Sequence, residues 1–476
     1  MTQRHNFLIG KEWRERGQTI PVVNPHTQEA IAEVCLAGRD EILQAISLAE
    51  RAFDKTRNLP AYLRSRICGQ TAQGIRSRRE EFARTIALES GKPLVFARAE
   101  TDRAAATFEI AAEEAKRIGG EVLDLDVAEH ARGKIGIARR FPIGPVAGIS
   151  PFNFPLNLVA HKVAPALACG NPIVLKPSST TPLSALLLGK VLMETEAVEG
   201  SLSILPCKSA DAAPLVEDPR LKMVTFTGSA PVGWDIKRRA GKKKAVLELG
   251  GNAAVIVESD ADLELAAKKI CAGAFAFSGQ VCISVQRAFV HESRFDRFMD
   301  LLRQEIGKLK IGDPLDETVT FGPMIDLENA ERIEAWVGEA VRSGAQIVTG
   351  GKRKGALYEP TVLAGVDPAM KVSCQEAFGP ILTVEPYADF QKAIDRVNDS
   401  DFGLQSGIFT NQMDKVMQAF DRFEVGGVIV NDAPTFRVDN MPYGGIKESG
   451  FGREGVRYSM EEMTEIKLLV LNNCKD

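Results

Sequence analysis

The sequence predicts an α/β protein built from two doubly wound parallel sheets and a small β arm. From Gly144 onward, short apolar segments alternate with helix-like segments, which is typical of parallel sheets covered by helices on both faces. A second alternation of this kind begins at Val246 and runs to about residue 430. A hairpin over 121–142 and a late strand over 466–471 fit neither alternation, so we assign them to an arm.

The length and charge of the chain limit the classes of protein to consider. Its 476 residues, of which 45% are hydrophobic and 26% charged, are too many for one hydrophobic core. The net charge is −4, the pI is about 6.0 and no basic stripe is visible, so we expect no nucleic-acid partner. No apolar run reaches the roughly 20 residues of a membrane span, and the amino-terminal segment lacks the apolar core of a signal peptide.

The cysteines and histidines also bear on compartment and cofactor. The eight cysteines are scattered and form no CxxC pair, which favours free thiols in a reducing compartment, the cytoplasm. The five histidines show no metal-ligand spacing, so we expect no metal site.

The part of the chain before the first alternation contains short strands and then helices. The pattern over residues 1–36 predicts short strands around turn signals such as Asn24-Pro25. From Arg39 to about Ile118, apolar residues recur every three or four positions, which predicts helices. Gly119-Gly120 ends the last of these helices, and the following hairpin contains an alternating strand pattern over 134–139.

The two alternations give the remaining elements in order. The first predicts strands over 146–149, 172–175, 202–205 and 223–226, with helices over 156–167, 181–193 and from about 231. The second predicts a strand at 246–247, a helix over 261–277, a strand over 288–290 and a helix over 294–307. We therefore divide the chain into one domain over 1–120 and 143–245, a second over 246–442, and an arm over 121–142 and 456–476.

The segment FAFSGQVCISVQR, residues 275–287, presents the first candidate for chemistry. Gly279 permits a sharp bend after an apolar helix, and Cys282 follows that bend at the edge of a cleft. A thiol attacks only as its thiolate, so its surroundings decide whether it reacts. Free cysteines are most often packing residues, which is the reading we prefer for Cys271 on the preceding helix.

Two further residues complete a set for covalent acyl transfer. Glu248, in LELGGN, is a carboxylate among apolar neighbours, and burial would raise its pKa toward the working range of a general base. Asn153, in SPFNFP, lies between prolines that restrict the backbone, so its amide can act as a fixed oxyanion donor. A nucleophile, a base and an oxyanion donor are what acyl transfer requires.

Two strand ends carry residues suited to a phosphate-containing ligand. Lys176, in LKPSS, follows a buried strand, and Gly228, Ser229 and Gly233, in FTGSAPVG, lie at a strand–helix turn. Ligands of open parallel sheets bind beyond the carboxyl ends of the strands, and a free helix N-terminus favours a phosphate. The spacing is not GxGxxG, so in isolation this turn is equally well explained as a plain connection.

At these motifs the chain resembles the aldehyde dehydrogenase superfamily, nearly from end to end and with the motifs in the same order. The resemblance implies that Cys282 attacks the aldehyde, that Asn153 and the Cys282 backbone N–H hold the oxyanion, and that Glu248 activates the hydrolytic water. It implies a Rossmann-like NAD(P)-binding domain over 1–120 and 143–245, and a catalytic domain over 246–442. The arm would cross to a neighbouring subunit, giving a homodimer or homotetramer.

The resemblance also assigns cofactor-binding residues. It places the adenosine ribose at Lys176, the pyrophosphate at Gly228, Ser229 and Gly233, and the nicotinamide ribose and ring at Glu376 and Phe378 of EAFGP. Strongly NAD-selective members carry a glutamate where this chain has Ser179, and a serine can contact either a 2′-hydroxyl or a 2′-phosphate. The expected cofactor is therefore NAD or NADP, and we hypothesise that NADP is accepted.

The substrate is expected to be a small aldehyde. Val281 and Ile283 flank the nucleophile and offer no anion site, which leaves Arg103 and Arg437 as candidate substrate anchors. Arg437 lies in the loop that admits substrates in the family, although a loop arginine is more often solvated. The chain most resembles the branch that oxidises lactaldehyde, glyceraldehyde-3-phosphate without phosphorylation, and succinate semialdehyde. That branch implies a hydroxylated or anionic substrate.

Two alternatives belong to the same superfamily. A CoA-acylating dehydrogenase would lack the carboxylate at Glu248, and a catalytically silent structural member would be expected to lose Cys282 or Glu248. The presence of both residues favours an active, hydrolytic enzyme.

Overall fold

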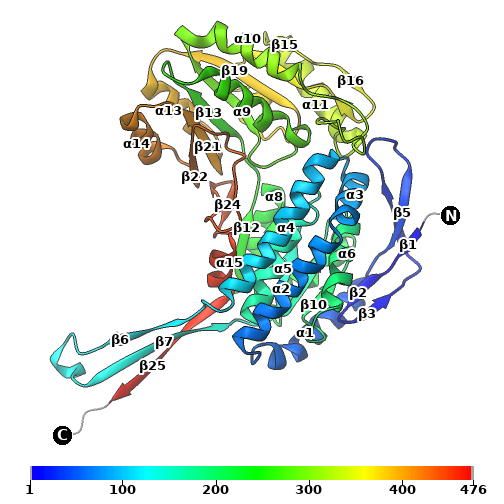
Figure 1. Cartoon of the computed structure of the whole chain (residues 1–476), viewed down its shortest axis with the longest axis vertical. Helices are drawn as coiled ribbons and strands as arrows, with labels where there is room; N and C mark the ends of the chain where they lie inside the picture. Colours follow the sequence, from blue (N-terminus) through cyan, green and yellow to red (C-terminus); the bar gives the residue numbers. More distant parts are fainter. Residues whose placement is uncertain (1–2, 473–476) are drawn as a thin grey trace.

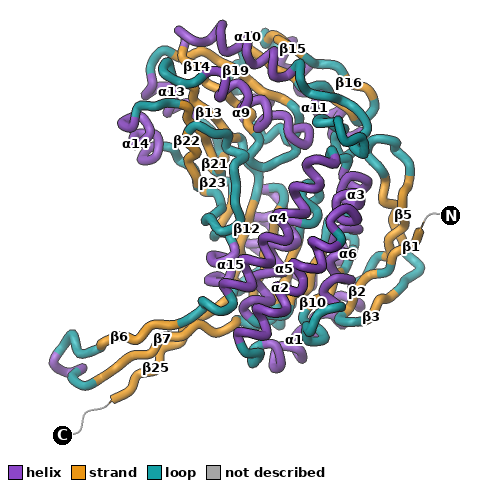
Figure 2. Tube along the Cα trace, viewed as in Figure 1, coloured by secondary structure: helices purple, strands orange, loops and turns teal. Residues whose placement is uncertain are grey.

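The computed structural model describes residues 3–472 and consists of two α/β bodies and an extended arm. Figure 1 shows the first body, with its blue and cyan helices, below the second body, which is coloured green to orange. The arm leaves the first body on one side and ends near the carboxyl terminus. In Figure 2, helices surround the strands of both bodies, whereas the strands of the arm extend beyond them.

The first body is built on an eight-stranded sheet. Its order is β24 (Gly450–Phe451), β12 (Lys244–Glu248), β11 (Met223–Thr227), β8 (Val146–Ile149), β9 (Ile173–Lys176), β10 (Leu202–Ile204), β2 (Phe7–Ile9) and β3 (Glu12–Arg14). The five strands from β12 to β10 are parallel, and the short strands at both edges are antiparallel to their neighbours. The predicted doubly wound sheet is thereby confirmed.

Alternate residues of these strands pack against helices on opposite faces, as expected for a buried parallel sheet. Val146 and Ile173 belong to one hydrophobic cluster, and their neighbours Ala147 and Val174 belong to the other. The first cluster contains residues of α2 (Ala61–Ser77), α3 (Arg79–Ser90), α4 (Leu94–Glu114), α5 (Asn157–Cys169), α6 (Leu183–Met193) and α15 (Val456–Glu462). The second contains residues of α1 (Arg39–Thr56), α7 (Ala213–Glu217) and α8 (Ala230–Arg239).

The second body is built on a seven-stranded sheet. Its order is β15 (Gln346–Thr349), β18 (Thr361–Ala364), β19 (Ile381–Tyr387), β14 (Val285–His291), β13 (Ala253–Val257), β21 (Gln405–Phe409) and β22 (Gly427–Val430), and only β15 is antiparallel to its neighbour. Separate hydrophobic clusters hold α9 (Leu263–Phe275) with α10 (Phe295–Ile306), α11 (Leu327–Arg342) with α12 (Lys371–Cys374), and α13 (Phe390–Asn398) with α14 (Met413–Arg422).

The arm is a three-stranded antiparallel sheet in the order β25 (Thr464–Asn472), β7 (Lys134–Pro142) and β6 (Gly120–Asp124). β25 pairs with β7 from Thr464 opposite Pro142 to Asn472 opposite Lys134. The predicted hairpin is confirmed, and the late strand is longer than the sequence pattern indicated. The rest of the predicted arm, residues 473–476, lies outside the described residues.

Two of the predicted boundaries were wrong. β12 pairs in parallel with β11 along its whole length, so this strand belongs to the first sheet. The second alternation therefore begins at Ala253 rather than at Val246. α15 contributes Val456 and Met460 to the first hydrophobic cluster, so the arm begins at β25 and not at residue 456. In both cases the local pattern identified an element but could not show which sheet or core it joins, because that depends on distant partners.

Smaller elements connect these parts. They are β1 (Gln3–His5), β4 (Thr19–Val23) and β5 (Ala30–Cys35) in one sheet, the pairs β16 (Arg353–Lys354) with β17 (Leu357–Tyr358) and β20 (Phe402–Gly403) with β23 (Ile446–Lys447), and the short turns η1 (Glu129–Ala131), η2 (Ser209–Ala212), η3 (Ala276–Gly279) and η4 (Glu292–Arg294). Among residues 3–472, no helix has the length and apolar character needed to cross a bilayer.

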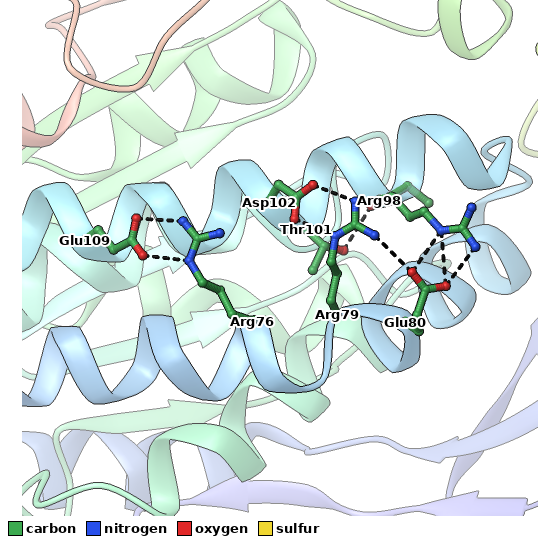
Figure 3. A network of polar contacts seen from close by, with 8 residues as sticks. Arg76, Arg79, Glu80, Arg98, Thr101, Asp102 and Glu109 are labelled. Carbon is green, nitrogen blue, oxygen red and sulfur yellow. Dashed lines mark hydrogen bonds and ion pairs between the residues drawn. The ribbon is translucent and has the colours of Figure 1, made fainter.

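Helix α4 is fixed against its neighbours by surface ion pairs (Figure 3). Arg76 of α2 contacts Glu109 at 2.7 and 2.8 Å, and Arg79 of α3 contacts Asp102 through two bonds of 2.7 Å. Such exposed pairs each contribute about 1 kcal/mol or less, but bidentate geometry fixes direction. This matters for the site because Asp102 directly precedes Arg103, one of the predicted substrate anchors.

Candidate active site

The loop before Cys282 has an unusual backbone. Phe277, Ser278 and Gly279 follow α9 in η3 and have φ angles of 48°, 55° and 69°, a left-handed conformation that non-glycine residues seldom adopt. The hydroxyl of Ser278 donates to the carbonyl oxygen of Gly322 at 2.6 Å, and a Cβ on Gly279 would lie 2.2 Å from the oxygen of Gly379. Strain of this kind is characteristic of functional sites, and here it turns the chain out of the helix toward Cys282.

The sulfur of Cys282 belongs to a half-buried residue and contacts a tyrosine. Its Sγ lies 3.1 Å from the hydroxyl oxygen of Tyr443. Burial raises the pKa of the Cys282 thiol to about 11, and the hydrogen bond from Tyr443 and the positive charge of Arg437 oppose that rise. The thiol is therefore largely neutral near pH 7, and attack on a carbonyl carbon requires loss of this proton.

Glu248 is suited to take a proton. It ends β12, is buried, and neither carboxylate oxygen has a hydrogen-bond partner in the described part of the chain. Burial, reinforced by the neighbouring carboxylate of Glu454, raises the pKa of Glu248 well above its usual value. A Cβ on Gly444, whose φ is 155°, would lie 2.8 Å from Glu248 Oε1, so glycine is needed for this close approach.

Asn153 lies against the nucleophile loop. Its Nδ2 donates to the backbone oxygen of Gln280 at 3.0 Å, and its Oδ1 is buried without a partner among residues 3–472. Nδ2 has a second hydrogen that this bond does not use. The predicted oxyanion donor is therefore bonded to the loop that presents the sulfur, at a residue two positions before Cys282.

A buried ion pair positions the Asn153 segment. Lys92 donates to the backbone oxygen of Asn153 at 2.7 Å and forms an ion pair with Glu100. Glu100 in turn accepts from the backbone N–H groups of Leu156 and Asn157 at 3.0 and 3.1 Å. Sequence reasoning missed this pair because a lysine in the turn Gly91-Lys92-Pro93 looks exposed and gives no signal of its burial.

The structure brings the three predicted catalytic residues to one place. Asn153 contacts the loop that carries Cys282, and the charge of Glu248 acts on the pKa of Cys282. Two consecutive residues also connect Cys282 with Glu248. Tyr443 contacts the Cys282 sulfur, and Gly444 lies against the Glu248 carboxylate. A nucleophile, an amide donor and a proton acceptor thus converge, as covalent acyl transfer requires.

A cavity of about 400 Å³ lies at the carboxyl ends of β8, β9 and β11. Of the predicted cofactor residues, it is lined by Lys176, Ser179, Gly228 and Ser229. Ser229 is the residue before α8, and its side chain makes no capping bond, so the N-terminus of that helix is available to a phosphate. The donor set and the position beyond the strands fit an adenine dinucleotide.

Gly233 has a different role from the one predicted. It does not line the cavity, and a Cβ on it would lie 2.3 Å from Leu249 Cδ2. The missing side chain therefore lets α8 pack closely beside the end of β12.

Glu376 and Phe378 lie between this cavity and Cys282. Glu376 Oε1 accepts from the N–H of Gly251 at 2.9 Å, and burial raises the pKa of Glu376 to about 7. Phe378, with φ of 45°, packs edge to face on the cavity-lining Phe152 at 5.7 Å between centroids. A Cβ on Gly251 would lie 2.1 Å from the backbone oxygen of Cys282, so Glu376 is linked to the Cys282 loop through Gly251, and Phe378 is linked to the cavity through Phe152.

The two predicted substrate anchors are joined by a buried polar network. Arg103 and His161 both contact Asp439 Oδ1, at 2.7 and 2.8 Å. Arg437 lies 3.3 Å from Glu454 Oε2 and 3.4 Å from His161 Nδ1. Because Arg437 can only donate, His161 accepts at Nδ1 and carries its hydrogen at Nε2. The alternative of a solvated loop arginine is wrong for Arg437, whose side chain is 7% exposed.

Each of these arginines retains an unused donor. Nε of Arg103 and Nε of Arg437 are buried without a partner in the described structure. The Arg437 guanidinium also lies 3.6 Å above the ring of Tyr443, which contacts the Cys282 sulfur. Arg437 therefore lies close to the sulfur, and both arginines have a donor that could bind an anion.

Sequence reasoning missed several residues of this network. Lys162 donates to Glu454 at 3.1 Å and to Thr227 at 2.7 Å, and both Lys162 and His161 are buried on α5. The available signal was an adjacent histidine and lysine inside the otherwise apolar segment NLVAHKVAPALAC. Buried charges need partners, so such a pair in an apolar helix indicates a polar network.

Within the described residues, no cluster of histidine, cysteine, aspartate or glutamate has the arrangement of a metal site. A doubly wound fold with a cavity at the carboxyl ends of its strands, together with a cysteine, a buried glutamate and an amide donor in one place, is the arrangement of a nicotinamide-dependent aldehyde oxidoreductase. The profile of the aldehyde dehydrogenase family matches residues 13–469, and the chain belongs to that family.

Three known proteins show how close the similarity is. The chain is 45% identical over 471 residues to 3-sulfolactaldehyde dehydrogenase of Priestia aryabhattai, covering 99% of this chain and 98% of that one. Aldehyde dehydrogenase 21 of Physcomitrella patens, solved with the reaction product succinate, superposes with a TM-score of 0.97 at 45% identity, covering 99% of both chains. Glyceraldehyde-3-phosphate dehydrogenase GapN of Methanocaldococcus jannaschii, solved with NADP, gives 0.92 at 39% identity, covering 97% of this chain and 100% of that one.

These similarities confirm the family and the predicted branch. The activity is the NAD- or NADP-dependent oxidation of a small aldehyde.

Proposed function

We propose that this enzyme oxidises a small aldehyde carrying one negative charge, a carboxylate or a sulfonate, to the corresponding acid. The observation that carries the proposal is the pair of arginines, Arg103 and Arg437, whose buried Nε–H groups have no partner among the described residues. An anion that reached both arginines would satisfy these donors, and it would lie beside Tyr443 and the Cys282 sulfur.

The charge of the network favours a monoanion. Its cations are Arg103, Lys162 and Arg437, and its carboxylates are Asp439 and Glu454. Burial would raise the pKa of Glu454, but Lys162 and Arg437 hold it below its usual value, so it is ionised. Burial and Arg437 also lower the pKa of His161, so this histidine is neutral. One positive charge remains unbalanced, which suits a carboxylate or sulfonate better than a phosphate dianion.

The names of the relatives agree with this substrate class. 3-Sulfolactaldehyde, the substrate in the name of the Priestia protein, carries one sulfonate, and the succinate bound to the Physcomitrella protein is the acid formed from a carboxylated aldehyde. A small hydroxylated aldehyde such as lactaldehyde remains the second candidate, because it would fit the same space without using the arginines.

The proposed reaction begins with sulfur attack. Cys282 gives its proton to solvent water and forms a bond from sulfur to the aldehyde carbon, while Asn153 Nδ2 and the Cys282 backbone N–H stabilise the oxyanion. Bound NAD(P) supplies the acceptor for the hydride that leaves this carbon. Lys176, Ser179, Gly228 and Ser229 would hold its adenosine and pyrophosphate part, and Glu376 and Phe378 its nicotinamide part.

The second half of the reaction is hydrolysis. Glu248 takes a proton from water, the water oxygen attacks the thioester carbon, and the carbon–sulfur bond breaks with its electron pair left on Cys282. A partner-free carboxylate beside the sulfur supports hydrolysis over acyl transfer to CoA. The same groups disfavour a silent structural role, since nothing in a structural protein requires them to converge.

The cofactor preference is part of the proposal. Ser179 lines the cavity together with Lys176, and its hydroxyl donates to the backbone oxygen of Cys207 at 3.3 Å. A neutral hydroxyl and a nearby cation tolerate a 2′-phosphate, so we expect NADP to be accepted as well as NAD.

We also propose that the enzyme is a homodimer, alone or within a homotetramer, joined by the arm. Among residues 3–472, β25 has only β7 beside it in its sheet, and its apolar residues Ile466, Leu469 and Val470 are 61%, 54% and 48% exposed. β22 is the edge of the seven-stranded sheet, and the preceding helix α14 exposes Met413 and Phe420. Exposed edges and apolar surface favour pairing of the arm with a second copy. Light scattering that showed only monomer would contradict this.

A reducing location is consistent with the nucleophile. All seven cysteines within residues 3–472 are free thiols, and the proposed chemistry needs Cys282 reduced, so we place the enzyme in the cytoplasm.

The test of the proposed function is a substrate panel. kcat/KM would be measured for succinate semialdehyde, 3-sulfolactaldehyde, lactaldehyde, glyceraldehyde-3-phosphate, propanal and hexanal, with and without CoA. We expect the two monoanions to be preferred and CoA to have no effect. Cys282→Ala should abolish oxidation, whereas Cys271→Ala, a control in the packed core of α9, should retain it. Preference for hexanal would refute the anionic substrate.

A further inference from the structure

Tyr443 is a buried residue whose hydroxyl points at the proposed nucleophile. The residue is 3% exposed, and its hydroxyl oxygen lies 3.1 Å from Cys282 Sγ. In the part of the chain that the structure describes, this sulfur is the only side-chain hydrogen-bond partner of that hydroxyl. A buried phenol normally finds a partner among backbone carbonyls or polar side chains, so a thiol as partner calls for an explanation.

The position of the phenol is fixed on several sides. The backbone N–H of Tyr443 donates to Glu454 at 3.0 Å, and the N–H of Glu454 donates back at 2.6 Å. The Arg437 guanidinium covers the ring at 3.6 Å, and the ring shares a small hydrophobic cluster with Ile283 and Leu404. The hydroxyl therefore has little freedom to turn away from the sulfur.

We propose that Tyr443 is a catalytic residue whose hydroxyl accepts a hydrogen bond from the Cys282 thiol at rest and donates one to the sulfur whenever the sulfur is negatively charged. A phenolic hydroxyl has both a hydrogen and lone pairs, so it can serve in both states without moving. This inference rests on the proposed role of Cys282 as the nucleophile.

The hydrogen bond acts at two points of the reaction. Before attack, the Cys282 proton passes to solvent water, and a charge-assisted bond from Tyr443 stabilises the resulting thiolate. During hydrolysis, the carbon–sulfur bond breaks, its electron pair stays on sulfur, and Tyr443 donates to the leaving thiolate. A lower pKa of the Cys282 thiol raises the thiolate fraction near neutral pH more than it lowers the nucleophilicity of each thiolate. Stabilisation of the thiolate before attack therefore increases the rate.

Arg437 strengthens this donor. A cation 3.6 Å above the ring withdraws electron density from the phenol, which makes its O–H a better donor to an anion. Arg437 therefore acts on the sulfur through Tyr443, while its Nε–H has no partner among the described residues.

The test measures the thiolate directly, without turnover. The rate of iodoacetamide alkylation at Cys282 is followed from pH 6 to 10 by mapping the peptide that carries it, in the wild type, Tyr443→Phe and Tyr358→Phe. Tyr358 is a buried tyrosine in the core of the second body and serves as the matched control. At pH 8 we expect Tyr443→Phe to react about tenfold more slowly, with its pH profile displaced upward, and Tyr358→Phe to match the wild type.

Two outcomes would overturn the inference. One is a Tyr443→Phe profile that superposes on the wild type in a variant with unchanged melting temperature. The other is a deficit in the rate of the cofactor-reduction burst in Tyr443→Phe that stays constant as the pH rises, because an effect on the resting thiolate must shrink once the thiol ionises unaided. Failure of the proposed function is a separate result, since it would appear as oxidation surviving in Cys282→Ala.

Discussion

Asn153 donates from Nδ2 to the backbone oxygen of Gln280 at 3.0 Å, two residues before Cys282. The bond joins the end of β8 to the loop that carries the sulfur, so the two segments cannot move independently. The proposed oxyanion donor is thereby tied to the loop of the proposed nucleophile, and such an arrangement lowers a barrier without reorganisation during the reaction.

Replacement of Asn153 should reduce catalysis while leaving the thiol reactive. Asn153→Ala removes an oxyanion donor, which typically costs about 10²–10³ in kcat. Alkylation of Cys282 by iodoacetamide should be unchanged, because that reaction forms no oxyanion. A parallel loss of both rates would mean that Asn153 only shapes the loop.

Replacement of Glu248 should separate the two halves of the reaction. Glu248→Gln keeps the shape of the side chain but removes the base, so we expect a normal burst of reduced cofactor followed by turnover slowed about 10²-fold or more. Stopped-flow absorbance measures both phases. Loss of burst and turnover in equal measure would argue that Glu248 is needed before the thioester forms.

The same residue gives a pH dependence of defined sign. Burial and Glu454 raise the pKa of Glu248, so the base is protonated and inactive at low pH. In the wild type, kcat should therefore rise with pH through this raised pKa, and Glu248→Gln should lose that rise.

Local motifs were sufficient to single out three residues that the structure brings together. Cys282, Glu248 and Asn153 lie in segments with unusual combinations of glycine, proline and apolar residues, and the structure brings them together. The parallel strands were predictable for a similar reason, since alternation of short apolar segments with helices is a local pattern.

What could not be predicted depends on contacts between distant segments. The membership of β12 in the first sheet is set by its pairing with β11 and β24, and no pattern within residues 244–248 reveals it. The burial of Arg437 depends on Glu454 and on His161, which lies 276 positions away in the chain. Tyr443 was missed because a tyrosine before two glycines suggests a turn, and only the fold shows that its hydroxyl meets the sulfur.

Arg103→Gln should selectively weaken the binding of anionic substrates. The variant removes one of the two free Nε–H donors, so we expect kcat/KM for succinate semialdehyde to fall about tenfold or more, mainly through KM, with propanal little affected. Arg98→Gln is the matched control, because Arg98 lies on the same helix but pairs with Glu80 and Glu317 on the surface. Equal losses for both aldehydes would place the anion elsewhere.

The buried pair of Lys92 and Glu100 should be more important for stability than its surface counterparts. Lys92→Met leaves an uncompensated buried carboxylate, which we expect to lower the free energy of unfolding by about 3–5 kcal/mol. Glu100→Gln in the same chain removes that charge but keeps an acceptor for Leu156 and Asn157, so the double variant should regain part of the loss. Urea denaturation of all three proteins measures this coupling, and additive effects would show that the two side chains act separately.

Ser179→Glu should convert the enzyme to strong NAD selectivity. Ser179 lines the cavity beside Lys176, and a carboxylate there would accept from the ribose 2′-hydroxyl of NAD and repel the 2′-phosphate of NADP. We expect kcat/KM with NADP to fall at least about tenfold while the value with NAD is maintained, since 1.4 kcal/mol of repulsion is sufficient for that ratio. Ser178→Glu, at the neighbouring cavity-lining position, is the control for added charge alone. If both variants changed the ratio equally, the effect would come from the general field of the cavity, and the assignment of the ribose to Ser179 would be wrong.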